Sequence, residues 1–109
     1  MILITVKFTA RPEFSETWMS QVAEFTRATR EEPGNVFFEW SRSVENPDQY
    51  VLLEAFESAE AGAVHVNSEH FKTAMAALPG TIATKPQIIY VDAPVDGWSE
   101  MAELSPADS

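Results

Sequence analysis

The sequence predicts a small α+β domain, and three observations lead to that fold class. Segments with alternating apolar residues, as in strands, are interspersed with two segments whose apolar residues recur every three or four positions, as in helices. Their order along the chain is strand, helix, strand, strand, helix, strand, which is the ferredoxin-like βαββαβ arrangement. A length of 109 residues fits one domain.

Residues 1–34 predict the first strand and the first helix. The strand, within residues 1–10, has two alternating sets of side chains: Ile2, Ile4, Val6 and Phe8, and Leu3, Thr5, Lys7 and Thr9. Pro12 suits the first turn of a helix, where its missing N–H costs no hydrogen bond. That helix has one apolar stripe, formed by Phe14, Trp18, Val22, Phe25 and Ala28. Residues 31–34 end it, because Pro33 disfavours helical backbone in the residue before it.

Residues 35–57 predict an antiparallel hairpin. Its strands are residues 35–44 and 49–57, and the turn between them contains Pro47, which presets a turn conformation. The hairpin supplies the two middle strands of the βαββαβ order.

The second helical region and the last strand follow the hairpin. Ser58 is a suitable N-cap for a helix over residues 59–66. Ser68 can cap a further helical segment, which carries Phe71, Met75 and Leu78. Residues 85–92 predict the fourth strand.

The chain divides into a domain over residues 1–93 and a C-terminal extension over residues 94–109. The extension contains Trp98, Met101 and Leu104 at helical spacing, so we expect it to be partly helical and then frayed. Its apolar stripe can lie on a partner subunit or on its own subunit.

Both faces of the hairpin carry apolar side chains, which predicts a homodimer. The helices of this topology cover only one face of a four-stranded sheet. Two sheets packed face to face across a twofold axis bury the other face, in a closed or nearly closed barrel. We therefore expect a dimeric α+β barrel, since an exposed apolar sheet promotes aggregation.

Charge and composition exclude several classes of partner. The formal net charge is -10, which argues against nucleic acid and anionic membranes because both would be repelled. No apolar run approaches the roughly 20 residues that span a bilayer. The absence of cysteine excludes disulfides and thiolate chemistry. With no secretory signal at the N-terminus, we expect a cytoplasmic location.

Five segments together resemble a known family. They are Glu32-Pro33-Gly34-Asn35, Phe38-Glu39-Trp40-Ser41-Arg42-Ser43, Asn46-Pro47, Tyr50-Val51-Leu52-Leu53-Glu54 and His65-Val66-Asn67-Ser68-Glu69-His70-Phe71. They look like the antibiotic biosynthesis monooxygenase superfamily, which includes quinol monooxygenases, anthrone oxygenases, haem-degrading monooxygenases and an isomerase of a phosphorylated signalling sugar. The match covers most of residues 1–92.

The resemblance implies a dimeric α+β barrel with a pocket between the sheet and the helices. For the oxygenase branch it implies oxygen chemistry without flavin or metal, so no cofactor is expected. A deprotonated phenol or hydroquinone can itself give an electron to dioxygen, and the protein then has to supply a base, a dry pocket and orientation. The haem-degrading branch relies on an asparagine in the first strand; this chain has none there, which disfavours haem oxygenation.

His70 and His65, the only histidines, are the candidate catalytic residues. Histidine suits the removal of a phenolic proton because its pKa is near neutral. In an unbroken helix the two would lie about 140° apart, so they share a pocket only if the helix breaks between them. The alternative role for His70 is packing or capping beside Phe71. A metal ion is not expected, because no third ligand is nearby in the sequence.

Glu54 lies inside an apolar strand, so its carboxylate must be paired or its pKa must rise. If the turn pairs Val44 with Tyr50, Trp40 faces Glu54 and Arg42 is a diagonal neighbour. The candidate pocket residues are Trp40, Glu54, Arg42 and Tyr50. The alternative is a structural ion pair between Arg42 and Glu54, and a register slip of one residue would separate the cluster.

The first functional hypothesis is a cofactor-independent monooxygenase that uses dioxygen to oxygenate a small aromatic substrate, a quinol or a polycyclic phenol. The second is a non-catalytic dimeric module that binds a small ligand or serves a stress response. The third is an isomerase of a phosphorylated metabolite, for which 7 dispersed Lys and Arg residues supply few cations. The substrate itself does not follow from the sequence.

Overall fold

The computed structural model describes residues 1–107 and contains one antiparallel sheet with the strand order β2-β3-β1-β4. The strands are β1 (Ile2–Thr9), β2 (Asn35–Arg42), β3 (Gln49–Phe56) and β4 (Gln87–Asp92). Helices connect β1 to β2 and β3 to β4. The ferredoxin-like α+β fold that the sequence predicts is therefore confirmed.

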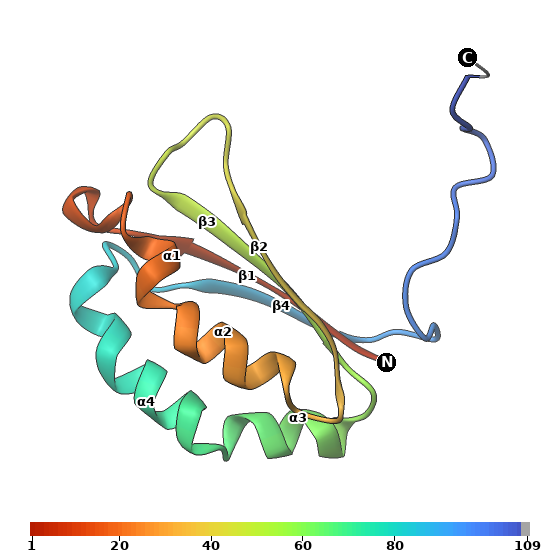
Figure 1. The fold of residues 1–109 in the computed structure, drawn as a ribbon, viewed down its shortest axis with the longest axis horizontal. Helices are drawn as coiled ribbons and strands as arrows, with labels where there is room; N and C mark the ends of the chain where they lie inside the picture. Colours follow the sequence, from red (N-terminus) through yellow and green to blue (C-terminus); the bar gives the residue numbers. More distant parts are fainter. Residues whose placement is uncertain (108–109) are drawn as a thin grey trace.

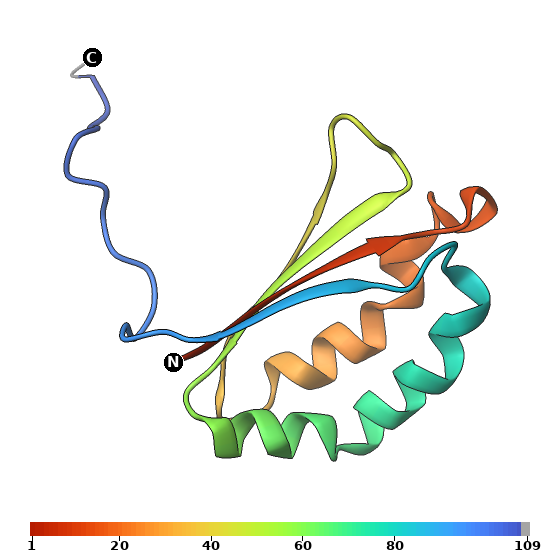
Figure 2. The same cartoon turned by 180° about the vertical axis from the view of Figure 1, so that it is seen from behind.

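The helices form one layer on a single face of this sheet (Figures 1 and 2). They are α1 (Trp18–Gln21), α2 (Ala23–Arg30), α3 (Ala59–Val66) and α4 (Glu69–Ala77), with 3₁₀ turns at Pro12–Phe14 and Leu78–Thr81. Within residues 1–107, no helix has the length and apolar character that crossing a bilayer requires.

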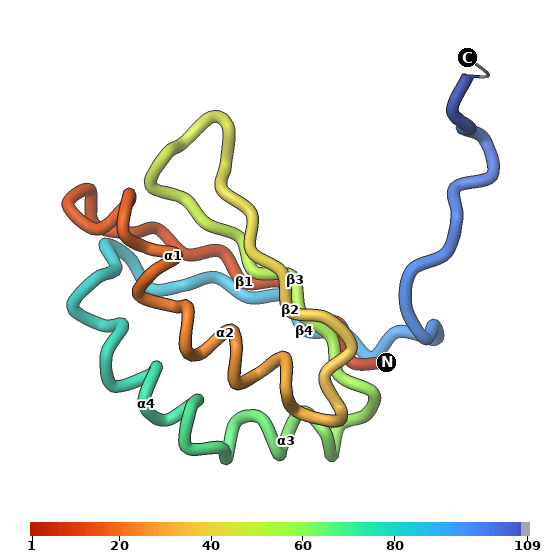
Figure 3. The backbone as a smooth tube through the Cα atoms, viewed as in Figure 1, coloured from red at the N-terminus to blue at the C-terminus, as the bar shows by residue number. Residues whose placement is uncertain are grey.

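The first helical region is bent, whereas the sequence predicts one continuous helix from Pro12. The residues around Pro12 form a separate 3₁₀ turn, and α1 and α2 meet at Val22, which has a φ of -96° and a ψ of 4°. The hydrogen-bond ladder continues through this junction, because the N–H of Val22 donates to the Trp18 carbonyl at 3.0 Å. Trp18 and Val22 are both buried. Figure 3 shows the path of the chain through α1 and α2.

The hairpin register differs by two residues from the predicted one. Tyr50 pairs with Arg42 rather than with Val44, and Glu54 pairs with Phe38. The reason is the loop: the N–H of Ser43 donates to the Gln49 carbonyl, so the strands separate earlier than the Pro47 turn alone predicts. A shift of two residues keeps every side chain on its predicted face.

The core lies between the helix layer and the sheet and is largely aromatic. Trp18 is fully buried, and its ring centroid is 5.4 Å from that of Phe8 and 5.7 Å from that of Tyr50. Aromatic side chains each bury about 150–250 Å², so this group provides much of the apolar burial that holds α1 and α2 on the sheet.

The C-terminal extension leaves the body of the domain after β4 (Figures 1 and 2). We expected it to be partly helical, but residues 93–107 contain turns and irregular chain and no helix. A short amphipathic helix needs a surface to pack on, and Met101 and Leu104 are exposed here. Trp98 lies near the sheet, with its ring centroid 5.5 Å from that of Phe37. The end of the expected frayed segment, residues 108–109, lies outside the described residues.

Candidate functional site

The two histidines come together because the helical segment between them is interrupted. Ser68 separates α3 from α4 and caps α4, since its Oγ accepts a hydrogen bond from the Phe71 N–H at 3.2 Å. The same Oγ donates to the His65 carbonyl at 2.6 Å. The imidazole centroids of His65 and His70 are 6.0 Å apart as a result. The helix break that a shared site for the two histidines requires is therefore present.

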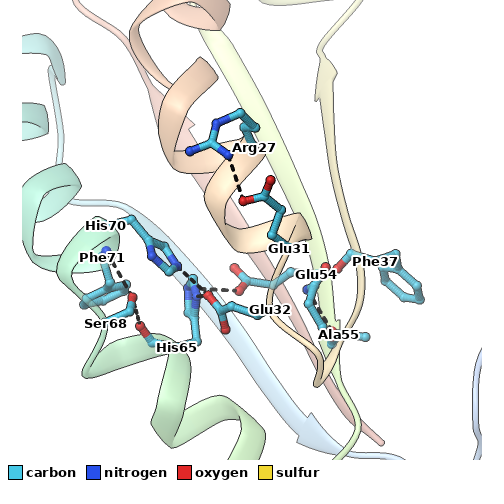
Figure 4. Close-up of polar contacts among 11 residues, drawn as sticks. Arg27, Glu31, Glu32, Phe37, Glu54, Ala55, His65, Ser68, His70 and Phe71 are labelled. Atoms are coloured by element: carbon cyan, nitrogen blue, oxygen red, sulfur yellow. Dashed lines mark hydrogen bonds and ion pairs between the residues drawn. The ribbon is translucent and has the colours of Figure 1, made fainter.

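A carboxylate from a distant part of the chain joins the two histidines. Glu32 lies in the turn between α2 and β2, and its Oε2 is 2.8 Å from Nδ1 of His65 and 2.5 Å from Nε2 of His70 (Figure 4). The Glu32 side chain is only 8% exposed. Its other oxygen, Oε1, is buried and has no hydrogen-bond partner among residues 1–107. We call these three residues the Glu-His-His cluster.

The turn that carries Glu32 packs directly on α3. A Cβ atom on Gly34 would overlap the Cβ of Ala61. The Gly34 carbonyl also accepts a hydrogen bond from the Glu57 N–H at 2.9 Å, just before α3 begins. Glycine at this position therefore lets the turn approach α3 closely enough for Glu32 to reach His65.

Glu54 lies beside the cluster on the helix-facing side of β3. Its Oε1 is 3.9 Å from Nε2 of His65, and the residue is 6% exposed. Burial, followed by the nearby negative charge of Glu32, raises the pKa of Glu54 to about 7. The expectation of a poorly solvated carboxylate is confirmed.

The alternative role of Arg42 and Glu54, a structural ion pair, is contradicted by the structure. The observed register places Phe38 opposite Glu54 and moves Arg42 further along the sheet. Arg42 donates instead to Glu16 through Nη2 at 2.6 Å and to the Pro47 carbonyl through Nε at 2.7 Å. The Glu54 carboxyl group therefore faces the Glu-His-His cluster rather than a guanidinium.

Aromatic rings enclose the imidazole of His65. Its centroid lies within 6.1 Å of four phenylalanine rings, those of Phe25, Phe38, Phe56 and Phe71. Desolvation lowers the pKa of His65, although its hydrogen bond to Glu32 acts in the opposite direction. The surroundings therefore favour a neutral imidazole with one N–H and one bare nitrogen.

His70 is the member of the cluster that reaches the surface. Its side chain is 22% exposed and lines a groove of about 410 Å³ between α2 and α4. The groove has apolar walls from Val22, Phe25 and Leu78, and it also includes Glu24. Pockets of about 300–1,000 Å³ hold small organic ligands, so the groove has the size for one aromatic molecule.

Trp40 and Tyr50, two of the candidate pocket residues, pack in the aromatic core. The Tyr50 hydroxyl donates to the Ser15 carbonyl at 2.8 Å, and Nε1 of Trp40 donates to Oγ1 of Thr26 at 2.8 Å. Both polar atoms thus already have partners inside the protein. Neither residue lines the groove beside His70.

The cluster can move a proton or hold a cation. A carboxylate only accepts hydrogen bonds, so in the tautomer that suits Glu32 the facing ring nitrogens carry the hydrogens and Nδ1 is the bare nitrogen of a neutral His70. A histidine in this state can take a proton while the carboxylate stabilises the imidazolium, as in a catalytic triad. The three potential ligand atoms also lie within 4.8 Å of one another, close enough to share one metal ion.

Glu32 is the site residue that the sequence analysis missed. It belongs to the Glu-Pro-Gly turn, whose sequence indicates the end of a helix and forms part of the family resemblance. The predicted hairpin contained a signal for this contact: in an antiparallel hairpin, the residues before the first strand lie beside the segment that follows the second strand. Asn35 does pair with Phe56 in the structure, which places Glu32 next to α3.

Comparisons with known proteins agree with this fold. The family model described as "Antibiotic biosynthesis monooxygenase" matches residues 1–77. No match is found among the curated proteins.

Several solved structures share the fold. A structure of an antibiotic biosynthesis monooxygenase is 19% identical, covers 85% of this chain and 98% of that chain, and has a TM-score of 0.78. A candidate antibiotic biosynthesis monooxygenase from Caulobacter crescentus CB15 is 27% identical over 84% of this chain and 88% of that chain, with a TM-score of 0.80. The protein Rv0793 from Mycobacterium tuberculosis is 21% identical over 90% and 98% of the two chains, with a TM-score of 0.79.

Proposed function

The chain belongs to the antibiotic biosynthesis monooxygenase family, and from this we propose that it is a cofactor-independent monooxygenase of a quinol or a polycyclic phenol. Dioxygen is the second substrate. A quinol and dioxygen yield a hydroxyquinone and water, so the organic substrate supplies all the electrons and no external reductant is needed. The observation that carries the proposal is His70, supported by Glu32, at a groove of small-molecule size.

The proposed reaction begins with the loss of a phenolic proton. Nδ1 of His70 takes this proton while Oε2 of Glu32 accepts the hydrogen bond from Nε2–H, so the imidazolium forms beside a carboxylate. The phenolate gives one electron to dioxygen. The resulting radical pair combines to form the new carbon–oxygen bond. The oxygen–oxygen bond then breaks as the attacked carbon loses its hydrogen, and the departing oxygen leaves as water with the proton held by His70.

The character of the groove supports a neutral aromatic substrate. Val22, Phe25 and Leu78 offer apolar walls, and the exposed carboxylates of Glu24 and Glu69 would repel an anion. No Lys or Arg lines this groove within the described chain. These features disfavour the isomerase of a phosphorylated metabolite, because a phosphate needs cationic partners.

His65 and Glu54 have a positioning role in this proposal rather than a catalytic one. His65 is 4% exposed, so a substrate in the groove does not touch it. Its hydrogen bond to Glu32 holds the carboxylate in the orientation that serves His70. Glu54 lies behind His65 and acts through it.

A homodimer through the helix-free face of the sheet is part of the proposal. Apolar side chains that point to this face include Leu3, Phe37, Leu53, Ile89 and Val91. Ile89 is 66% exposed in the single chain, and Trp98 of the extension lies over Phe37. A contiguous exposed apolar patch favours association, and a second copy of the same sheet is a complementary cover.

Oxygen uptake with a reduced quinone such as menadiol tests the activity. The parent chain, treated with a chelator, is expected to consume oxygen faster than the uncatalysed autoxidation and to form a hydroxyquinone. The variant His70→Ala should lower kcat/KM by about 10²–10⁴-fold. The control Glu60→Gln, which changes an exposed carboxylate on α3 outside the groove, should leave kcat close to the parent value.

Two results would reject the enzymatic proposal. The first is the absence of protein-dependent uptake with any quinol or polycyclic phenol. The second is equal binding of such a compound to the parent and to His70→Ala without turnover by either, which would favour the non-catalytic binding module.

A further inference from the structure

We propose that the Glu-His-His cluster binds one divalent transition-metal ion, with Nδ1 of His65, Nε2 of His70 and the carboxylate of Glu32 as ligands. These atoms lie within 4.8 Å of one another, and no second cluster of this kind occurs in residues 1–107. Two imidazoles and one carboxylate suit Zn²⁺, Co²⁺ or Fe²⁺ better than Mg²⁺ or Ca²⁺, which prefer oxygen ligands. The binding rests on the cluster's geometry and not on the proposed oxygenation.

The first supporting observation is an unpartnered oxygen. Oε1 of Glu32 is buried without a hydrogen-bond partner in the described chain, on a side chain that is only 8% exposed. A buried carboxylate oxygen without a partner is unfavourable, and such atoms in proteins call for an explanation. Because Oε1 belongs to the same carboxylate as the Oε2 that contacts both imidazoles, an ion bound there could be shared by both oxygens.

The second observation is the position of Glu54. A histidine that binds a metal through Nδ1 carries its hydrogen on Nε2, and metal-binding histidines usually donate this hydrogen to a carboxylate or a carbonyl. Nε2 of His65 faces Oε1 of Glu54 at 3.9 Å. Without a metal, the hydrogen of His65 is on Nδ1, toward Glu32, and the bare Nε2 then faces a carboxyl oxygen. In the metal-bound form the hydrogen on Nε2 of His65 points toward this carboxyl oxygen, which can accept it.

The movement that the ion requires is small. Glu32 now lies 2.8 Å from His65 and 2.5 Å from His70, which are hydrogen-bond distances. Ligand atoms at about 2.1 Å from a tetrahedral Zn²⁺ lie about 3.4 Å apart, so each distance would open by less than about 1 Å. His70 can make this adjustment because it lies at the groove, which also offers a path for the ion and room for a water ligand.

A bound ion would change the chemistry of His70. The metal takes Nε2, so the ring hydrogen moves to Nδ1, and Nδ1 can no longer accept a proton. An ion in the cluster should therefore inhibit the oxygenation proposed above. This consequence, unlike the binding itself, rests on the proposed function.

Calorimetric titration of the chelator-treated full chain with Zn²⁺ tests the binding without any substrate. Excess Mg²⁺ in the buffer occupies the exposed carboxylates of this chain, whose net charge is -10. Under this condition we expect one Zn²⁺ ion to bind per chain. Titration with Co²⁺ should produce the visible absorption of a nitrogen- and oxygen-ligated ion. Both His70→Ala and Glu32→Gln should weaken Zn²⁺ binding by more than about 100-fold, whereas Glu69→Gln should not change it.

Variants of Glu54 separate a metal site from adventitious binding. Glu54→Leu removes the acceptor for Nε2–H of His65 and should weaken Zn²⁺ binding by about 10–100-fold. Glu54→Gln keeps an acceptor oxygen and should weaken it less. The inference is overturned if the parent binds neither Zn²⁺ nor Co²⁺, or if His70→Ala binds Zn²⁺ as tightly as the parent. A failure of oxygen uptake alone would leave it standing, since binding is measured separately.

Discussion

Nε2 of His70 and Oε2 of Glu32 are 2.5 Å apart in the folded chain, although the residues are 38 positions apart in the sequence. The contact joins the start of α4 to the turn that follows α2. It depends on the interruption of the helix at Ser68 and on the close approach of Gly34 to α3. Both local features can be tested apart from the proposed chemistry.

Glu32→Gln tests whether the carboxylate supports His70. An amide can occupy the same space but cannot stabilise an imidazolium by charge, so we expect kcat for a quinol to fall by about 10²–10⁴-fold with the fold unchanged. Glu31→Gln is the matched control, because Glu31 is exposed and pairs with Arg27. Steady-state kinetics with circular dichroism provide the measurement. Equal kcat values for the two variants would contradict the role of Glu32.

Gly34→Ala tests the approach of the turn to α3. The new methyl group would overlap Cβ of Ala61, so we expect a loss of about 1–3 kcal/mol in the free energy of unfolding. Gly62→Ala is the control: its Cβ meets nothing within 4 Å, and alanine should stabilise α3 by about 0.5–1 kcal/mol.

The double variant Gly34→Ala/Ala61→Gly extends this test, since it removes the methyl group that the first change would strike. Urea denaturation should show that it recovers part of the lost stability, although glycine in α3 carries its own cost of about 1 kcal/mol. If Gly34→Ala proves as stable as the parent, the close approach does not constrain the turn.

Tyr50→Phe tests whether the Tyr50 hydroxyl serves the core or a substrate. The hydroxyl donates to the Ser15 carbonyl inside the core. Its removal should therefore lower the free energy of unfolding by about 1 kcal/mol and leave kcat and KM unchanged. Tyr90→Phe, at an exposed position, should change stability by less than about 0.5 kcal/mol. A large rise in KM for Tyr50→Phe would instead place the hydroxyl in a substrate pocket.

Leu53→Glu tests the proposed dimer. Leu53 points to the helix-free face of the sheet, and a carboxylate buried there without a partner would cost several kcal/mol. Sedimentation velocity at micromolar concentration should show the parent as a dimer and this variant as a single subunit. Val64→Glu, on the exposed surface of α3, should remain a dimer. A parent that sediments as one subunit would reject the interface.

Local patterns predicted most of the fold. Alternation in residues 1–10 predicted β1 because one face of that strand packs beneath helices, and Ser68 predicted the helix break because a serine N-cap acts on its own neighbours. The burial of Glu54 followed from its apolar flanks. Each inference depended on residues close together in the sequence.

The contacts that the sequence predicted incorrectly depend on strand register or on packing between segments far apart in the sequence. The Pro47 turn predicted a tighter hairpin than the one formed, because the Ser43–Gln49 hydrogen bond closes a longer loop. Arg42 consequently lies beside Glu16 rather than Glu54. The stripe of the C-terminal extension predicted a helix, but a helix of that length forms only against a surface that covers it.

The amino-acid sequence by itself determined the order of the elements, the face on which each strand side chain lies and the serine caps that start α3 and α4, because short-range sterics and hydrogen bonding govern these features. Only the tertiary structure decided that Glu32 meets His65 and His70, which are 33 and 38 positions away. Such a contact depends on how closely packed elements approach one another, and here a missing Cβ at Gly34 permits that approach.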